Sequence, residues 1–520
     1  MKTTWCNCRN LFLLGFCALV VSAPAVAATA IPFTVTMSES VTVTGTPRIV
    51  LDVGGNARYA TYSSGSGTSS LTFTYSATAG DVDLDGIGVS STTLDLNGGT
   101  VSDLNGNAIS NLTFTPPANM GSVFINYPSL SLDFVADSDG RYTLNGTAYN
   151  DLTSFLTATS GTFTRASTAT YYDSSGTLQT AASGAARFDY DPVTHVAKGI
   201  LIEESRINYL RASAAIDDAA YWNKTGTVAP IITANAALAP DGTMSAEEID
   251  LTPATDTRPN QVNSMSGALN QNATYFSVWL KAKTAPGTIS LAGRRADGVI
   301  ISSTVNVTMD WQRFTMTIPA STGASSSLVY VGHRGFGGTC LNYYAWGAQL
   351  EIGTFITSYI PTTTATVTRA LDNLTIPVGA WYNASTTTIS GNYSSFAVNG
   401  YSTRIASLND GTSSNVFQIA DSSGGIILAQ KAIGGSILNS SGPTYVPNIS
   451  YKIAGAMDSS SGPLAVNNTL YSNTNAGLPP GITRIQIGNQ NGGSLLNGWI
   501  SQLKYYPTRV SDIQLQLLTQ

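Results

Sequence analysis

The run Phe33-Thr-Val-Thr-Met37 alternates apolar and polar side chains, and Leu71-Thr-Phe-Thr-Tyr75 repeats the pattern. Such an alternation places the apolar side chains on one face of an extended strand, and β-branched and aromatic residues favour strands. Glycine-rich turn signals accompany these runs at 54–56, 64–67 and 97–99. Short strands separated by such turns predict a β-sandwich of immunoglobulin size in this part of the chain.

The composition extends this interpretation to the whole chain. Of its 520 residues only 11% are charged, whereas a soluble globular domain has about 25%. A hydrophobic content of 42% with a net charge of −6 differs from the low hydrophobicity and high charge of disordered chains. The acidic balance and the lack of a basic run argue against a nucleic-acid partner. We therefore expect an all-β chain of tandem β-sandwiches, divided into three or four domains.

Residues 1–27 have the three parts of a secretory signal peptide. Lys2 and Arg9 supply the positive start, Leu11 to Val21 the apolar run, and Ala25-Val-Ala27 the cleavage site. The apolar run is too short for a permanent membrane anchor, and we expect no transmembrane segment. Cleavage would leave Cys340 without a cysteine partner, so no intrachain disulfide is expected. These features predict a secreted protein that works outside the cell, at a cell surface or on a virion.

A first resemblance rests on motifs that follow one another in a fixed order. The motifs are Tyr59-Ala-Thr-Tyr-Ser-Ser-Gly-Ser-Gly-Thr68, Leu71-Thr-Phe-Thr-Tyr75, Gly80-Asp-Val-Asp-Leu-Asp-Gly-Ile87, Leu96-Asn-Gly-Gly-Thr100 and Asp103-Leu-Asn-Gly-Asn-Ala108. In this order they resemble the immunoglobulin-like repeats of large bacterial surface proteins. The resemblance implies that residues 28–118 form an immunoglobulin-like β-sandwich that serves as a spacer or stalk.

A second resemblance covers part of residues 119–212, which otherwise form a connector. Its motifs are Phe163-Thr-Arg-Ala-Ser-Thr-Ala-Thr-Tyr-Tyr-Asp173, Ala186-Arg-Phe-Asp-Tyr-Asp-Pro192 and Gly199-Ile-Leu-Ile-Glu-Glu-Ser-Arg-Ile-Asn-Tyr-Leu210. They resemble a module common in phage virion and tail-fibre proteins, with Ile207 as a departure from the usual Thr. The resemblance implies an attachment or folding element.

The last two segments are expected to be sandwiches as well. Residues 213–370 contain the strand patterns 275–282, 311–318 and 343–351, and the last of these resembles the closing strand of carbohydrate-binding-like jelly-rolls. Residues 371–520 resemble concanavalin/laminin-G-like domains, because Leu496-Asn-Gly-Trp-Ile-Ser-Gln-Leu-Lys-Tyr-Tyr-Pro507 is a strand typical of that fold. Ser511 and Gln514 have the spacing of a capping box, which predicts a short C-terminal helix.

Asp81, Asp83 and Asp85 stand at alternate positions before Gly86, as in the first half of a calcium loop. A calcium ion is held by several oxygen ligands, which carboxylates supply. Thr92 occupies the twelfth position, where an EF-hand needs a bidentate Glu, so this motif is no EF-hand. Two interpretations stay open: a polar turn between strands, or a calcium site that other loops or a neighbouring domain complete.

Candidate sugar-binding residues are aromatic side chains beside polar turns. Trp222 and Trp381 have such neighbours, whereas the strand patterns assign Trp279, Trp311, Trp346 and Trp499 to the core. Arg295 and Arg334 belong to Arg-Arg and His-Arg pairs, which are unusual in so charge-poor a chain and could face an acidic glycan.

Catalysis has little support in the sequence. Neither His195 nor His333 lies near a nucleophile elbow, and the adjacent Glu203 and Glu204 would point to opposite faces of a strand. We therefore expect no enzyme, but non-catalytic recognition of a polysaccharide or cell-surface glycan, displayed in homo-oligomeric or otherwise repeated form because shallow sites bind weakly. The alternatives are a polysaccharide-degrading, tail-spike-like hydrolase and a structural protein that decorates a virion or binds other proteins.

Overall fold

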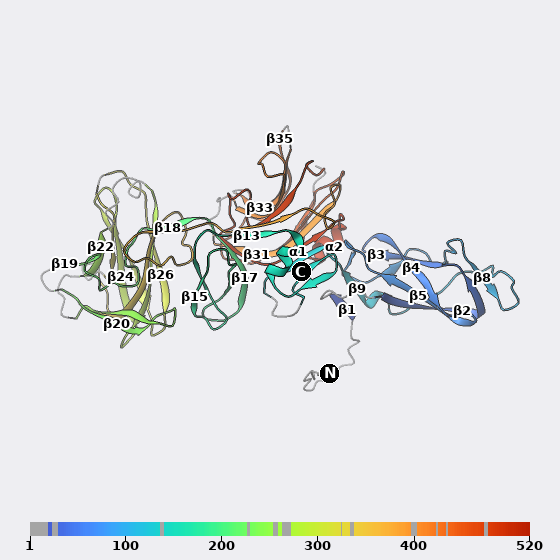
Figure 1. Ribbon diagram of the computed structural model, residues 1–520, viewed down its shortest axis with the longest axis horizontal. Helices are drawn as coiled ribbons and strands as arrows, with labels where there is room; N and C mark the ends of the chain where they lie inside the picture. The colour runs from blue at the N-terminus through green and yellow to red at the C-terminus, as the bar shows by residue number, and fades with distance from the viewer. Residues whose placement is uncertain are drawn as a thin grey trace.

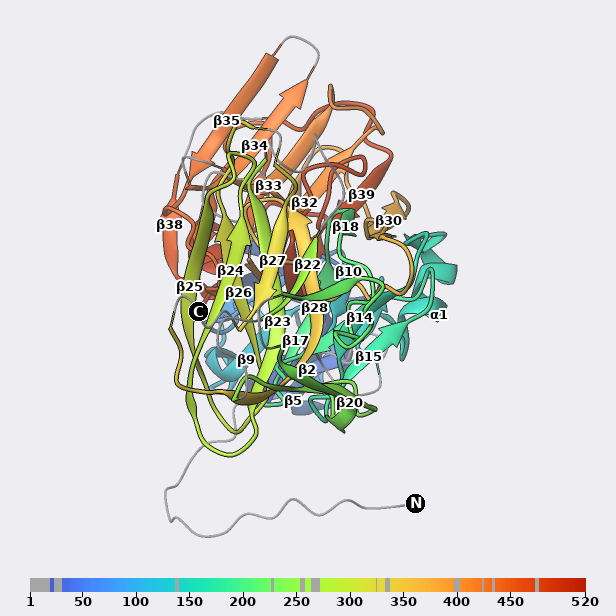
Figure 2. The same ribbon diagram turned by 90° about the vertical axis from the view of Figure 1, so that its left-hand side faces the viewer.

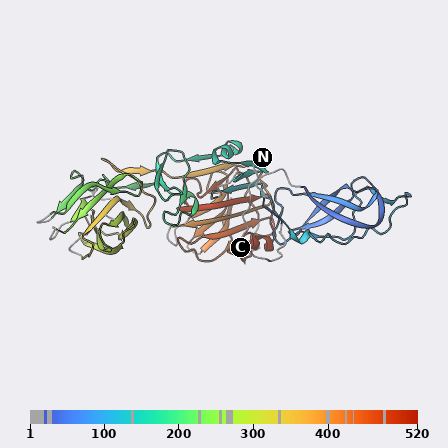
Figure 3. The ribbon, with the colours of Figure 1, turned by 90° about the horizontal axis from the view of Figure 1, so that it is seen from below.

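The computed structural model describes residues 19–22, 30–135, 140–225, 229–252, 258–262, 272–323, 325–332, 337–396, 403–422, 425–432, 435–472 and 477–520. Three bodies lie in a row along the long axis (Figures 1 and 3). We term them the N-terminal sandwich, the central sandwich and the jelly-roll. The prediction of an all-β chain of sandwiches with a short C-terminal helix is confirmed.

The N-terminal sandwich is blue in Figure 1 and has its own apolar core. Its main sheet has the order β7-β3-β4-β5-β2-β8, and a smaller sheet has the order β1-β9-β6. Alternate residues of β2 are buried from Ile31 to Met37, as the period-two pattern requires. The elements are β1 (Leu19–Ser22), β2 (Ala30–Thr44), β3 (Arg48–Val53), β4 (Asn56–Ser64), β5 (Thr68–Ser76), β6 (Val82–Asp83), β7 (Gly88–Val89), β8 (Thr100–Asp103), the 3-10 turn η1 (Met120–Ser122) and β9 (Val123–Asn126).

Strand β1 lies inside the predicted signal peptide, where it pairs in parallel with β9 from Leu19 to Ser22. The other residues of 1–27 lie outside the described residues. Among the described residues, no helix is long and apolar enough to cross a membrane.

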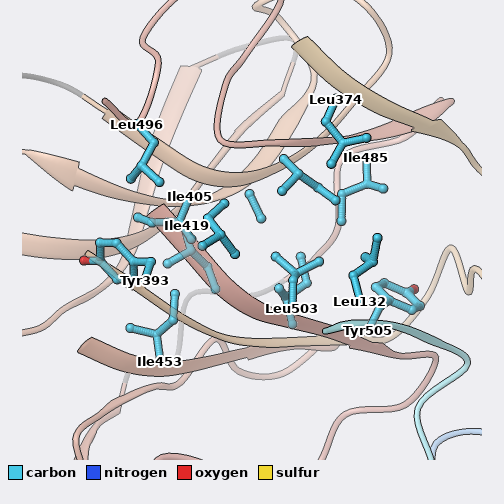
Figure 4. Packing of buried hydrophobic residues seen from close by; sticks show 14 of the residues in the cluster. Leu132, Leu374, Tyr393, Ile405, Ile419, Ile453, Ile485, Leu496, Leu503 and Tyr505 are labelled. Atoms are coloured by element: carbon cyan, nitrogen blue, oxygen red, sulfur yellow. The ribbon is translucent and has the colours of Figure 1, made fainter. Parts of the chain in front are cut away.

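The central sandwich is built from two separate stretches of the chain. One sheet contains β12-β11-β10-β40-β31-β36-β37-β38, with β17 joining β40 to β16, and the other has the order β13-β30-β39-β32-β33-β34-β35. Strands from 130–202 therefore share both sheets with strands from 373–506. Figure 4 shows how Leu132, Leu503 and Ile485 from these distant stretches meet in one core.

The elements of the central sandwich have the following bounds: β10 (Leu130–Asp133), β11 (Tyr142–Leu144), β12 (Thr147–Tyr149), α1 (Leu152–Thr159), β13 (Thr162–Thr164), β16 (Phe188–Tyr190), β17 (Ala197–Ile202), β30 (Asn373–Pro377), β31 (Thr387–Ser395), β32 (Thr403–Asn409), β33 (Val416–Ser422), β34 (Gly425–Ala432), β35 (Gly435–Ser441), β36 (Tyr451–Met457), β37 (Leu464–Val466), β38 (Thr469–Tyr471), β39 (Arg484–Ile487), β40 (Gly498–Tyr506) and α2 (Asp512–Leu517).

The jelly-roll is inserted between β17 and β30 of the central sandwich. A neck of β18 (Arg206–Asn208) and β29 (Val367–Arg369) brings its two ends together. The hairpin of β14 (Ala169–Tyr172) and β15 (Leu178–Ala181) packs against the jelly-roll, whose strands lie in front of it in Figure 2. One face is the sheet β19 (Trp222–Thr225), β22 (Arg258–Val262), β27 (Leu328–Val331), β24 (Gly287–Arg294) and β25 (Ile300–Val307). The other is the sheet β20 (Ile231–Leu238), β21 (Met244–Asp250), β28 (Asn342–Ile352), β23 (Thr274–Ala282) and β26 (Gln312–Ile318).

This topology divides the chain differently from the sequence motifs. The segment 119–212, which the sequence sets apart as a connector and module, supplies strands to the same sheets as 371–520. The physical reason is strand pairing: β40 takes β10 and β17 as partners as well as β31.

Candidate functional site

A cavity of about 230 Å³ opens at the seam between the jelly-roll and the central sandwich. Its walls come from β14, β15, β16, β17, β23, β26 and β40 and from the segments that follow β17, β28, β31 and β35. The aromatic side chains that line it are Tyr171, Tyr172, Trp279, Tyr359, Phe396 and Trp499. A concave, mainly apolar site with a few polar groups is the usual form of a small-molecule site. We term it the aromatic cavity.

A bulge between two strands of the jelly-roll places the side chains of Trp279 and Trp346 at the seam. The register of β23 on β28 shifts between Ser277 and Trp279, and Gly347 in β28 has φ +65°. A side chain at Gly347 would stand 2.7 Å from the Trp279 ring, so only glycine fits there. The result is a cluster in which Trp279 and Trp346 lie 5.4 Å apart and Tyr359 lies 5.3 and 4.9 Å from them, between ring centroids.

Trp499 faces this cluster from the central sandwich. Its indole Nε1 donates to Asp189 Oδ2 at 2.7 Å, and the backbone N–H of Tyr172 donates to Asp189 Oδ1 at 2.6 Å. The ammonium of Lys198 lies 4.7 Å from the centre of the Trp499 ring. Burial raises the pKa of Asp189, and the two hydrogen bonds oppose that shift. Trp499 is thus a half-buried ring held in a fixed orientation.

Arg313 lines the aromatic cavity and brings a positive charge to it. Its guanidinium lies 4.4 Å from the Trp279 ring centre and donates to the Thr357 carbonyl at 2.8 Å and to Ser277 Oγ at 3.0 Å. Burial lowers the pKa of Arg313, and the negative charge of Glu351 opposes this. These contacts fix Arg313 beneath the tryptophan.

Glu203 also lines the aromatic cavity, but its oxygens are occupied. Ser358 donates to both oxygens, at 2.7 Å from its backbone N–H and at 2.6 Å from its hydroxyl. Arg187 lies 2.8 Å away, and Arg369 forms a further ion pair. Asp372 joins Arg187 at 2.5 Å and Arg165 at 3.1 Å. This buried network holds the neck of the jelly-roll on the central sandwich.

A second cavity, of about 280 Å³, adjoins the first. Thr170, Leu178 and Tyr359 line both cavities and so form a shared wall. Its other lining is rich in hydroxyl groups: Thr180, Ser213, Thr243, Ser245, Thr362 and Thr363, together with Asp241 and Trp346. We term it the hydroxyl cavity.

Two of the predicted sugar-binding residues lie in cores. Trp222 is 0% exposed and donates from Nε1 to the Ala212 carbonyl at 2.9 Å. Trp381 is 3% exposed and packs edge-to-face on Tyr505 with ring centroids 4.8 Å apart. Neither offers a ring face to a ligand, because each packs inside its own sandwich.

Of the two predicted arginines, Arg295 alone belongs to the described residues. Arg295 lies in the turn after β24, where it forms an ion pair with Asp297 at 2.7 Å. Arg334 lies outside the described residues. Arg295 lines neither cavity.

The carboxylates of the Asp81-Val-Asp-Leu-Asp-Gly86 motif bind groups of the protein. Asp81 accepts from the Tyr75 hydroxyl at 2.5 Å and forms an ion pair with Arg58 at 2.7 Å. Asp83 accepts from the backbone N–H groups of Gly54 and Gly86, each at 2.7 Å. Among the described residues, no three His, Cys, Asp or Glu side chains form a group that could hold a metal ion.

This motif joins the N-terminal sandwich to the central one. Val82 is buried with Tyr506, Val510 and Leu515, and Leu84 packs against them. The side chain of Gln514 in α2 donates to Asp85 Oδ1 at 2.5 Å and accepts from the Leu84 backbone N–H at 2.7 Å. The predicted capping box is therefore not formed. Ser511 is the N-cap residue, but its side chain makes no cap hydrogen bond. The side chain of Gln514 binds the N-terminal sandwich instead.

Sequence reasoning missed the residues of both cavities. Trp279, Trp346 and Trp499 were expected in cores because they lie in strand patterns, and the first two are indeed buried at 3%. Their position at a seam depends on how the jelly-roll is inserted, which no local pattern records.

No family model matches the sequence, and neither does any curated protein. Parts of the chain are similar to solved structures of carbohydrate-binding modules and of sialidase and arabinanase domains. Domain 4 of AbnA, a GH43 extracellular arabinanase from Geobacillus stearothermophilus in complex with arabinotriose, is 12% identical, with 32% of this chain and 82% of that chain covered and a TM-score of 0.26. The CBM40 of the Ruminococcus gnavus IT-sialidase is 18% identical, with 26% and 84% covered and a TM-score of 0.23. The CBM22-1-CBM22-2 tandem of Paenibacillus barcinonensis Xyn10C is 12% identical, with 59% and 99% covered and a TM-score of 0.23.

Proposed function

We propose that this chain is a non-catalytic glycan-binding protein and that the aromatic cavity holds one sugar unit. The observation that carries the proposal is the set of fixed rings, Trp279, Tyr359 and Trp499, around a cavity edged by Asp189 and Arg313. A sugar ring has apolar C–H faces that pack on aromatic rings, and hydroxyl groups on its rim that need directed polar partners.

The position of the cavity suits recognition of a surface. It lies at the seam between the jelly-roll and the central sandwich, and the N-terminal sandwich extends from the other end of the central sandwich (Figure 1). The N-terminal sandwich would then be a spacer between the binding region and whatever carries it. Display of several copies on a cell surface or virion would raise the avidity of a weak site.

The test applies the purified full chain to immobilised bacterial polysaccharides and cell envelopes and measures both retention and released reducing ends. We expect retention on particular glycans without release. Trp499→Ala should weaken the retained interaction at least tenfold, which corresponds to about 1.4 kcal/mol. Tyr59→Ala is the control, because Tyr59 is an exposed aromatic side chain of the N-terminal sandwich and lines neither cavity. A lack of retention on every glycan and envelope would refute the proposal.

One observation favours a hydrolase as the second candidate. Asp189 and Glu203 line the same cavity, burial raises the pKa of Asp189, and two arginines form ion pairs with Glu203. A glycosidase needs one protonated and one ionised carboxyl group. We prefer binding because Glu203 is held by Ser358, Arg187 and Arg369, which leaves it poorly placed to attack a substrate. Release of reducing ends by the wild type, and its loss in Asp189→Asn, would favour the hydrolase instead.

A further inference from the structure

The hydroxyl cavity has a lining suited to a second polar ligand group. Thr362 is 6% exposed, and its Oγ1 has no hydrogen-bond partner among the described residues. A buried hydroxyl without a partner destabilises the protein, so a ligand that supplies the partner gains binding energy. Thr362 thus brings to the cavity wall a hydroxyl that the protein itself leaves without a partner.

Asp241 gives this cavity its charge. Its Oδ1 accepts from the Thr243 backbone N–H at 2.9 Å and from the Thr243 hydroxyl at 2.7 Å. Among the described residues no Lys or Arg forms an ion pair with Asp241, and no donor reaches its Oδ2. A carboxylate oxygen is a strong acceptor for a ligand hydroxyl and repels a second carboxylate.

Hydrogen bonds hold the residues of the shared wall in place. Tyr359 lines both, and its hydroxyl lies 2.6 Å from Ser213 Oγ. Thr170, in the same wall, donates from Oγ1 to the Tyr359 carbonyl at 2.6 Å. The two cavities thus adjoin each other, one lined by rings and the other by hydroxyls, along residues that are held in place.

From these observations we infer that the hydroxyl cavity is a second subsite, which takes the adjoining uncharged sugar unit of the glycan bound in the aromatic cavity. An uncharged unit offers hydroxyls that donate to Asp241 Oδ2 and bond to the hydroxyl groups of the lining. A uronic acid unit would place its carboxylate near that of Asp241. This inference rests on the proposed function, because it assumes that the aromatic cavity binds a sugar.

The test uses mono- to tetrasaccharides prepared from the polysaccharide that the full chain retains. Isothermal titration of the full chain should show at least a tenfold gain in affinity from the monosaccharide to the disaccharide. Asp241→Asn combined with Thr362→Val, both of nearly unchanged shape, should remove most of that gain. Asp297→Asn combined with Thr317→Val is the matched control, since both residues belong to the jelly-roll and line neither cavity.

The outcomes separate the two proposals. If no glycan is retained, the proposed function fails and the subsite fails with it. If glycans are retained but the mono- and disaccharide bind equally, only the second subsite is refuted, and this result needs no variant. A gain that survives in the double variant, or a preference for oligomers made wholly of uronic acid units, would also overturn the inference.

Discussion

Glu247 is a buried carboxyl group that keeps its proton near neutral pH. Burial and the neighbouring Asp217 raise its pKa from 4.5 to about 8, while the Asn235 backbone N–H, 3.2 Å from Oε2, opposes the shift. Between these two pH values the folded state binds a proton that the unfolded state has lost. The contribution of Glu247 to the free energy of unfolding is therefore largest below pH 4.5 and falls as the pH rises toward 8.

The buried carboxyl group of Glu247 leads to a prediction about how the unfolding temperature depends on pH. The wild-type unfolding temperature of the jelly-roll should be several degrees lower at pH 8 than at pH 5, because about 1 kcal/mol corresponds to about 2–4 °C in a domain of this size. Glu247→Gln should flatten this slope, as followed by tryptophan fluorescence. Glu248→Gln is the control, since Glu248 forms a partly exposed ion pair with Lys283. Equal slopes in wild type and Glu247→Gln would contradict the prediction.

The network at the neck gives a second prediction. Asp372 accepts from Arg187, from Arg165 and from the Glu203 backbone N–H at 3.0 Å, and it is 0% exposed. Asp372→Ala leaves two buried guanidinium groups without this partner, which costs about 3–5 kcal/mol. Calorimetry should show an unfolding temperature lower by about 10 °C. Asp95→Ala, in a partly exposed pair with Arg48, should change it by no more than about 2 °C.

At the scale of elements, alternation identified many of the strands. The patterns at 33–37, 71–75, 275–282 and 343–351 all lie in strands, within β2, β5, β23 and β28. Helix α1 was not predicted, because its eight residues include Thr153, Thr157 and Thr159, which favour helices weakly. Its one clear signal is Asp151, whose side chain caps Ser154 N at 2.8 Å.

The contact between the N-terminal and central sandwiches leads to a prediction about whether a bound metal ion stabilises it. Hydrogen bonds and ion pairs within the protein satisfy Asp81, Asp83 and Asp85, so a chelator should leave the unfolding temperature unchanged within about 1 °C. Gln514→Ala should instead lower it, because Asp85 and the Leu84 N–H lose a shared partner. Scanning calorimetry with and without EDTA measures both effects. A drop of several degrees with EDTA in the wild type would favour the calcium interpretation of the motif.

At the scale of the molecule, sequence reasoning could not reach the candidate site. The aromatic cavity collects residues from Thr170 to Trp499, and its seam exists because β17 and β40 pair across about three hundred residues. Local patterns record the face that a strand buries but not the strand that becomes its neighbour. Trp499 therefore had the pattern of a core residue, whereas its place beside Asp189 follows from the pairing of distant strands.

The pairing of β40 also sets an order of assembly. The strands of the jelly-roll all lie between residues 206 and 369, so this body can acquire its structure while later residues are still being synthesised. The central sandwich must wait for β40, and until then the edges of β10 and β17 that it covers stay open. Such a high contact order slows folding, and open edges invite contact with other chains. The pairing of β40, which completes the seam, is thus also the folding step that covers these edges and protects a newly made chain from aggregation.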